Sequence, residues 1–212
     1  LSFTSQQLAD HLGLEEATRK EVRAGLLRGP LSEADLDRLF GRGRWRAMRR
    51  FAHVQRKPDG SSKIRPIDNF KGNDGNACTS SHETIHCVSF EWIAFALHIA
   101  HSLCAELGVD LPLCRIGLDD QRSAYRYVLN GQPCFAVIAL WCSASCRVVY
   151  YWLPGHIFGA LSAVLNYNCV AEFMVAVSRV FLAVPCSHYF DDFPTLQFGA
   201  PSCSALSPPA KR

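Results

Sequence analysis

The segment His188-Tyr189-Phe190-Asp191-Asp192-Phe193 places two adjacent aspartates between aromatic residues, directly after a long apolar stretch. Its apolar flanks predict a buried hairpin whose charged tip reaches the surface. Two neighbouring carboxylates repel each other and are costly to bury without a cation, so we expect a positive group, most simply a divalent metal ion, at this tip. The alternative for this hexapeptide alone is a solvated Asp-Asp turn, because turns favour aspartate.

A second pair of acids, Asp119 and Asp120, ends the apolar stretch that begins at Cys114. The residues between the two acid pairs contain a predicted hairpin and a long predicted helix, which is enough chain to return the second pair beside the first on one sheet. Carboxylates at neighbouring strand tips can hold Mg²⁺ ions that keep positions free for water or substrate phosphates. Two such ions activate an attacking oxygen and stabilise a leaving one, as in nucleotidyl transfer.

The bulk composition predicts a globular, intracellular protein. With 212 residues, of which 49% are hydrophobic and 19% charged, the chain can bury a core as one domain or as a domain with a small N-terminal piece. No signal peptide is visible and most of the ten cysteines, such as Cys104, Cys134, Cys169 and Cys186, lie in apolar runs, so we expect them to be reduced and buried. Nucleus and cytoplasm are not distinguished, and the oligomeric state is left open.

The longest apolar run is interrupted by Glu172 and Arg179. It therefore falls short of the roughly 18–20 uninterrupted apolar residues of a membrane span, and we expect no membrane partner.

Basic residues crowd the stretch from Arg42 to Arg65, although the net charge of the whole chain is only +3. Such a local patch suits phosphates. The alternative is an ordinary solvated hairpin with charged arms.

A zinc site is a rival hypothesis of a different class. Cys78, His82, His86 and Cys87 could form a cluster, and Cys142 with Cys146 could add two thiolates. Neither pattern has the paired Cys-x-x-Cys spacing of structural zinc sites. A small cysteine and histidine metal-binding regulator nevertheless stays open at this point.

Capping patterns and hydrophobic periodicity predict the order of helices and strands. Helices are expected at 4–14 and 32–40, each opened by a capping box, and a Pro-Asp-Gly turn joins two basic strands at 51–55 and 63–68. The remaining expectations are a loop at 72–87, a helix packed against a sheet at 89–107, a strand at 114–120, a hairpin with arms at 134–141 and 146–153, a helix at 161–184, and strands at 187–190 and 194–196.

Four segments in order resemble the motifs of reverse transcriptases. The segment from Asp120 to Tyr125 is similar to their first catalytic motif, an Asp followed by Ala and an aromatic residue, and Tyr189-Phe190-Asp191-Asp192 is similar to their Tyr-x-Asp-Asp box. Phe158-Gly159 through Asn168 resembles the second motif, and Lys63-Ile64-Arg65-Pro66 with Asp68 and Phe70 resembles the fingers segment. The resemblance spans about residues 45–196 and is greatest to retroelement proteins of unicellular eukaryotes such as dinoflagellates.

The resemblance implies an α+β right-hand polymerase, with fingers and an antiparallel palm sheet flanked by helices. The expected domains are an N-terminal helical segment at 1–41, a fingers-like basic hairpin and loop at 42–88, a palm-like catalytic core at 89–198 and a disordered tail at 199–212. A thumb is not expected within this chain, which would then be a partial retroelement protein. The implied reaction is the addition of dNTPs to a primer 3′-hydroxyl on an RNA or DNA template, with two Mg²⁺ ions, or Mn²⁺, as cofactors.

The resemblance also implies roles for individual residues. The implied metal ligands and catalytic acids are Asp120 and Asp191, with Asp192 beside them and the backbone carbonyl of Gln121 as a further ligand. Tyr125 is implied as the aromatic gate beneath the sugar, although a core aromatic is the alternative. Lys63 and Arg65 would bind the triphosphate, Phe158 and Gly159 would line the nucleotide pocket, and the template phosphates would be bound by Arg44, Arg46, Arg49 and Arg50.

Two positions depart from the family pattern, Val164 in place of the usual Pro and Cys169 in place of a frequent Arg. Neither position belongs to the expected metal site. The rival within the same fold is a catalytically inactive polymerase remnant that only binds nucleic acid.

Overall fold

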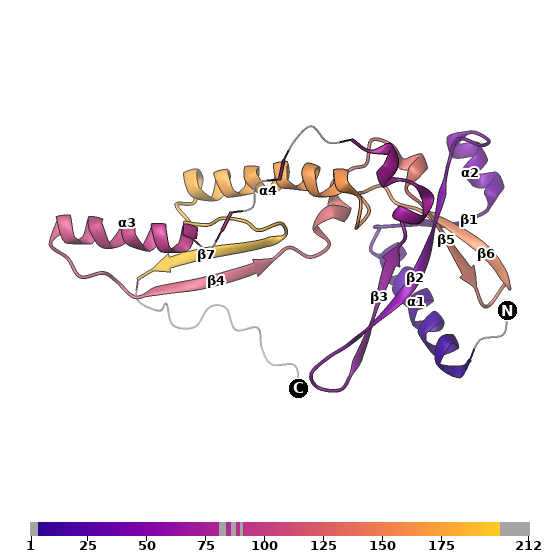
Figure 1. The fold of residues 1–212 in the computed structure, drawn as a ribbon, viewed down its shortest axis with the longest axis horizontal. Coiled ribbons are helices and arrows are strands. Elements are labelled where there is room, and N and C mark those ends of the chain that lie inside the picture. The colour runs from indigo at the N-terminus through magenta and orange to yellow at the C-terminus, as the bar shows by residue number, and fades with distance from the viewer. Residues whose placement is uncertain (1–3, 81–83, 86–87, 90, 200–212) are drawn as a thin grey trace. The chain divides into compact units, whose positions relative to one another are not determined.

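Two β-sheets and four α-helices form the part of the chain that the structure describes, which comprises residues 4–80, 84–85, 88–89 and 91–199. This computed structural model is drawn in Figure 1. The protein is therefore of the α+β class, as predicted. The predicted disordered tail lies outside the described residues from position 200 onward.

The chain divides into two units that are discontinuous in sequence. Unit 1 comprises Leu1–Thr84 and Ser123–Tyr167, and unit 2 comprises Ile85–Arg122 and Asn168–Arg212. Residues 123–167 belong with the N-terminal part because strand β5 (Val137–Cys142) pairs in parallel with strand β2 (Ala47–Arg56). The predicted domains were continuous segments, and nothing local in the sequence indicates this long-range pairing.

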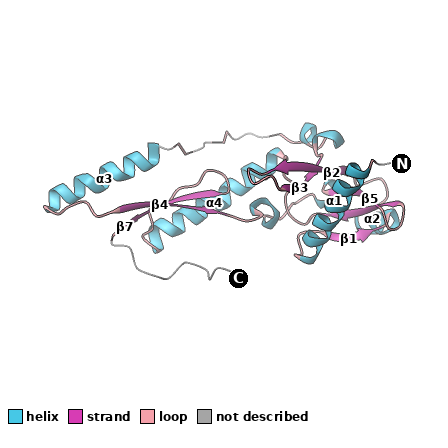
Figure 2. Cartoon of the chain, turned by 90° about the horizontal axis from the view of Figure 1, so that it is seen from below, coloured by secondary structure: helices cyan, strands magenta, loops and turns pink. Residues whose placement is uncertain are grey.

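The sheet of unit 1 has five strands in the order β1-β6-β5-β2-β3. Strand β1 spans Arg28–Leu31, β3 spans Ser62–Asp68 and β6 spans Arg147–Trp152. All five strands are labelled in Figure 1, and β1, β2, β3 and β5 are labelled in Figure 2. The β2–β3 and β5–β6 pairs are antiparallel hairpins, which confirms both predicted hairpins. Strand β1 was not predicted, because its short sequence Arg-Gly-Pro-Leu has the composition of a turn.

Helices α1 (Ser5–Arg23) and α2 (Glu33–Phe40) both begin with the predicted capping boxes, at Thr4 and Ser32. Helix α1 runs well beyond the predicted end at residue 14. Its second half is fixed by polar contacts that the apolar pattern does not reveal, since Glu15 accepts a hydrogen bond from the backbone N–H of Ser143 at 2.8 Å.

The core of unit 1 lies between α1, α2 and the sheet. Its largest fully buried apolar side chains are Leu27, Leu36, Met48, Val137, Ile138, Leu153, Ile157 and Tyr167. Helix α1 contacts both strands of the basic hairpin, and Gly13 lies so close to Ile64 of β3 that a Cβ would approach its Cγ1 to 2.9 Å. Apolar burial of this kind is the main stabilising term of a domain.

Unit 2 is built on a two-stranded antiparallel ribbon of β4 (Cys114–Asp120) and β7 (Asp192–Phe198). The predicted strand at 114–120 is confirmed. The prediction of a strand at 187–190 is wrong. The chain here forms isolated β-bridges, one between Cys186 and Thr195 and one between Tyr189 and Asp192. The return strand begins at Asp192 and runs further than predicted.

Helix α3 (Glu91–Leu107) forms where predicted, but none of its described residues is buried. The expectation that it packs against a sheet is therefore wrong for the described part of the chain. Phe95, Ile99 and Leu103 recur at helical spacing and are 64%, 42% and 52% exposed. The helix instead contacts the end of α4 through Trp92, whose ring lies 5.9 Å from the Arg179 guanidinium.

Helix α4 (Leu161–Phe181) begins in unit 1 and continues in unit 2. By length and composition alone, it is apolar enough to cross a membrane. The expectation that Glu172 and Arg179 interrupt the run too much for a membrane span is therefore corrected. Only 22% of the apolar window is buried, as a stripe of Ala163, Tyr167, Ala171 and Val175.

Candidate functional site

The ribbon of unit 2 brings acidic residues from distant parts of the sequence together. Its antiparallel register places Asp120 of β4 directly opposite Asp192 of β7, and Asp119 opposite Phe193. Directly opposed residues of an antiparallel pair lie on one face, with Cβ atoms about 4.5–5.5 Å apart. The two predicted acid clusters therefore meet at one end of the ribbon, but Asp192, rather than Asp191, stands opposite Asp120.

Asp191 lies in the tight turn that precedes β7. Tyr189 and Asp192 exchange backbone hydrogen bonds of 2.8 and 3.1 Å, and the N–H of Gln121 donates to the carbonyl oxygen of Asp191 at 2.9 Å. Phe190, the first residue of the turn, has a φ of 56°. A bulky residue with positive φ is strained by roughly 1–3 kcal/mol, and such strain is concentrated at functional sites.

Opposed carboxylates on one face of a β-ribbon destabilise it unless a cation lies between them. Within the described part of the chain, no Lys, Arg or His nitrogen is within ion-pairing distance of Asp120 or Asp192. The same part contains no group of three or more His, Cys, Asp or Glu side chains arranged to hold a metal ion. Two carboxylates fit Mg²⁺, which is commonly bound by one or two protein carboxylates together with waters and substrate phosphates.

In unit 1, the predicted nucleotide-pocket residues Tyr125 and Phe158 are in contact. Their rings are 5.1 Å apart and nearly perpendicular, and the Tyr125 ring also lies 4.9 Å from that of Tyr167. Tyr125 is 8% exposed, whereas Phe158 is 47% exposed. The aromatic face offered to solvent is therefore that of Phe158, with Tyr125 packed behind it.

Gly159 follows Phe158 in a loop that Asn76 holds in place. The Asn76 side chain donates to the carbonyl oxygen of Gly159 at 2.9 Å and accepts from the N–H of Leu161 at 3.1 Å. Gly159 has a φ of 89°, a conformation that favours glycine, and a Cβ there would meet nothing within 4 Å. Sequence reasoning missed Asn76, yet the lack of a capping side chain just before α4 signals that its first N–H groups need a distant partner.

A buried ion cluster joins the basic hairpin to the residue after Tyr125. Asp68 of β3 accepts hydrogen bonds from Arg50 at 2.7 and 3.0 Å and from Arg126 at 2.9 Å. Glu21 of α1 lies 2.9 Å from Arg50, and the Arg126 guanidinium also lies 5.5 Å from the centre of the Phe158 ring. The cluster thus links α1, β2, β3 and the aromatic pair within unit 1.

Burial and neighbouring charges shift the pKa values of Asp68 and Arg50 in opposite directions. Burial by itself would raise the pKa of Asp68, but the adjacent Arg50 and Arg126 guanidiniums hold that pKa below its usual value. Burial would lower the pKa of Arg50, and Asp68 and Glu21 raise it instead. Asp68 and Arg50 therefore both stay charged at neutral pH.

The assignment of Arg50 to template phosphates is wrong in this structure. Its side chain is 0% exposed and is bound by Asp68. Successive residues of a strand face opposite sides, so the neighbouring Arg49 is exposed while Arg50 points inward toward α1. Arg44, Arg46 and Arg49 remain exposed.

Lys63 and Arg65 share the exposed face of the hairpin. Their partners across the ribbon are Gln55 and His53, and Arg65 donates to the side-chain oxygen of Gln55. Phe51, on the same face, is 37% exposed. Basic and aromatic side chains interleaved in this way suit a nucleic-acid strand.

Most of the residues of the rival zinc cluster, His82, His86 and Cys87, lie outside the part of the chain that the structure describes. All described cysteines are free thiols. The expectation that they are buried is wrong for most of them: Cys186 is buried, Cys104 and Cys134 are partly exposed and Cys169 is exposed. Exposure of Cys169 follows from its place on the outer side of α4, away from the buried stripe.

No protein-family model matches this chain, and a search of curated proteins finds no significant match. The acid pair, the aromatic cluster and the basic hairpin are therefore the features on which a proposed function rests.

Proposed function

We propose that this chain is a reverse-transcriptase-like polymerase that adds deoxynucleotides to a primer 3′-hydroxyl on an RNA or DNA template. The observation that carries the proposal is the register that sets Asp120 opposite Asp192 at the end of the β4–β7 ribbon. The order of the motifs in the sequence supports it. In this interpretation, the ribbon belongs to a right-hand polymerase palm, the basic hairpin belongs to the fingers, and the protein derives from a retroelement.

The acid pair would bind the catalytic ions. Asp120 and Asp192 would hold Mg²⁺ or Mn²⁺, with Asp191 beside them and the backbone carbonyl of Gln121 as a further oxygen ligand. When bound, two such ions lower the pKa of the attacking hydroxyl and stabilise the leaving pyrophosphate. The opposed aspartates supply the negative charge that makes this binding favourable.

The residues of unit 1 would position the incoming nucleotide. Lys63 and Arg65 would bind the triphosphate, a role suited to an ammonium and a guanidinium fork. Phe158 would contact the sugar or base, and Tyr125 would fix the Phe158 ring from behind. Gly159 would leave room for close approach of the backbone to the nucleotide.

A metal-binding experiment tests the acid pair without requiring catalysis. We expect Mg²⁺ at tenfold its Kd to stabilise the wild-type protein against urea by about 1.4 kcal/mol. Asp192→Asn should abolish this response. In EDTA, the same substitution should stabilise the ribbon by about 0.2–1 kcal/mol, because it removes the repulsion between opposed carboxylates.

Asp119→Asn is the matched control, since Asp119 is the next residue along β4 and faces Phe193 instead of Asp192. Its Mg²⁺ response should equal that of the wild type. An equal Mg²⁺ response in wild type and Asp192→Asn would contradict the metal assignment.

Primer extension then tests the reaction. We expect incorporation of dNTPs by the wild type and its loss in Asp120→Asn. If Mg²⁺ fails to stabilise the protein and no extension occurs, while a single-stranded oligonucleotide still binds, the chain is an inactive remnant and the polymerase proposal is wrong.

A further inference from the structure

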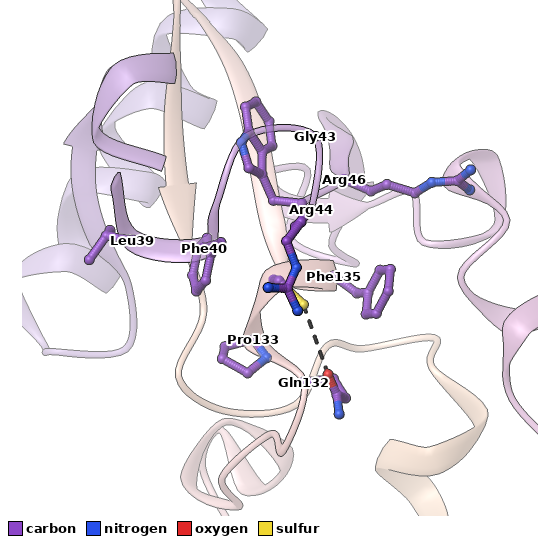
Figure 3. A pocket seen from close by; sticks show the side chains of 10 residues that line it. Leu39, Phe40, Gly43, Arg44, Arg46, Gln132, Pro133 and Phe135 are labelled. Carbon is purple, nitrogen blue, oxygen red and sulfur yellow. Dashed lines mark hydrogen bonds between the residues drawn. The ribbon is translucent and has the colours of Figure 1, made fainter. Parts of the chain in front are cut away.

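A hollow in unit 1 lies beside the turn between α2 and β2 (Figure 3). Gly41 and Gly43 in this turn have φ values of 91° and 70°, which favour glycine. A Cβ on Gly41 would also lie 3.0 Å from Cδ of Arg44, so the turn leaves space for the arginine stem. The opposite wall is the 3₁₀ turn Pro133–Phe135, and the N–H of Arg46 donates to the carbonyl oxygen of Cys134 at 3.1 Å.

Arg44 supplies positive charge to this hollow. Figure 3 shows its side chain extending into the hollow on the side where Gln132 lies, whereas Arg46 points away, toward the carbonyl oxygen of Asn73 to which it donates at 3.3 Å. The described lining contains no carboxylate. Nor does any described acid lie within ion-pairing distance of Arg44.

The other walls are flat and apolar. Phe135 is 39% exposed. The Trp45 ring is fixed because its Nε1–H donates to Asp37 at 2.8 Å and its centre lies 5.5 Å from that of the Tyr150 ring. The hollow measures about 470 Å³. That volume lies within the range of roughly 300–1,000 Å³ that small-molecule sites occupy.

We propose that this hollow binds a nucleobase carrying a phosphate. Arg44 binds the phosphate, since a guanidinium fork matches its oxygens. The base stacks on Phe135. The Gln132 side-chain N–H donates to the edge of the base, while its oxygen accepts from the Cys134 thiol at 3.9 Å. The same chemistry is offered by a free mononucleotide and by one nucleotide of a single strand. The site uses neither the aspartates nor a metal ion, so it stands independently of the polymerase proposal.

Calorimetric titration in EDTA tests the site with AMP, adenosine, inorganic phosphate and a single-stranded DNA hexamer as probes. We expect AMP to bind at least tenfold more tightly than adenosine or phosphate. Arg44→Gln should weaken AMP binding about tenfold by removing a charge-assisted hydrogen bond. Phe135→Ala should weaken it about tenfold by removing the stacking surface.

Arg38→Gln is the matched control, because it removes the same charge from the exposed face of α2, outside the hollow. Binding of AMP that depends on Arg44 but not on Arg38 supports a free nucleotide as the ligand. The same dependence seen with the hexamer alone supports a nucleotide within a strand. The proposal would be overturned if Arg44→Gln and Arg38→Gln lost equal affinity for AMP. It would also be overturned if neither AMP nor the hexamer bound at millimolar concentration.

Discussion

Replacing Asp68 by asparagine tests the buried ion cluster of unit 1 most directly. The carboxylate of Asp68 is 1% exposed and binds Arg50 and Arg126, whose side chains are 0% and 4% exposed. Asparagine keeps the shape of the side chain but removes its charge. The two buried guanidiniums would then share one carboxylate, that of Glu21, which is 23% exposed and more strongly screened by water. Arg50 would keep its hydrogen bond to the Thr18 hydroxyl at 3.2 Å.

The expected loss is large because breaking a buried pair leaves uncompensated charge. Removing one partner of such a pair typically costs about 3–5 kcal/mol, against a total domain stability of about 5–15 kcal/mol. With a urea m-value near 2 kcal/mol/M, the unfolding midpoint should fall by about 2 M. Tryptophan fluorescence reports mainly on unit 1, because Trp45, Trp141 and Trp152 belong to it and Trp92 to unit 2.

The control is Asp59→Asn, which makes the same chemical change at the exposed tip of the hairpin. Asparagine keeps the side-chain oxygen that accepts from Ser61 at 2.9 and 2.6 Å, so the midpoint should stay close to that of the wild type. A loss below about 1 kcal/mol for Asp68→Asn, a typical value for an ordinary substitution, would refute the role of the cluster. The pH dependence provides a second readout. Because the pKa of Asp68 is lowered in the folded protein, its contribution to the free energy of unfolding is complete above about pH 4 and is lost as the pH falls through the folded pKa. The urea unfolding curves of the wild type and of Asp68→Asn should therefore converge in acid.

Substitutions at three other positions test local features of the fold. Ser32→Ala removes the hydroxyl that accepts from the N–H of Asp35 at 3.2 Å and should lower the free energy of unfolding in urea by about 0.5–2 kcal/mol. Gly155→Ala would press a Cβ against the backbone carbonyl of Arg126, so thermal unfolding should reveal a loss of about 1–3 kcal/mol. Tyr125→Ala should cost about 3–5 kcal/mol in urea by emptying the space beside Phe158 and Tyr167, whereas Tyr125→Phe, which keeps the ring, should cost much less.

Features set by residues close in sequence could be predicted. The capping boxes at Thr4 and Ser32 and the hairpin around Asp59 depend on side chains a few positions apart, and all three form. The helix expected from residue 161 also forms, because its apolar periodicity continues over many turns. The approach of the two acid clusters was inferred from chain length and strand ends, and the register confirms that approach.

Features set by long-range packing could not be predicted. Arg49 and Arg50 look equivalent in the sequence, but α1 covers one face of the hairpin and thereby buries Arg50 against Asp68. Register likewise depends on the whole ribbon, which is why Asp192 rather than Asp191 stands opposite Asp120. Asn76 caps α4 from a segment far away in sequence, and no local pattern identifies such a cap.

The charge of Asp68 and that of the pair Asp120 and Asp192 are balanced differently, and this difference supports the proposed metal site. Asp68 is matched by two guanidiniums within the fold, which is how a structural carboxylate is normally accommodated. Asp120 and Asp192 are set face to face by backbone pairing, beside a strained turn at Phe190, with no described basic group in ion-pairing distance. A ribbon selected for stability alone would gain from an asparagine or lysine at either position. The proposed role of these two acids is to bind a cation, and the contrast between Asp192→Asn and Asp119→Asn in EDTA and in Mg²⁺ measures that binding directly.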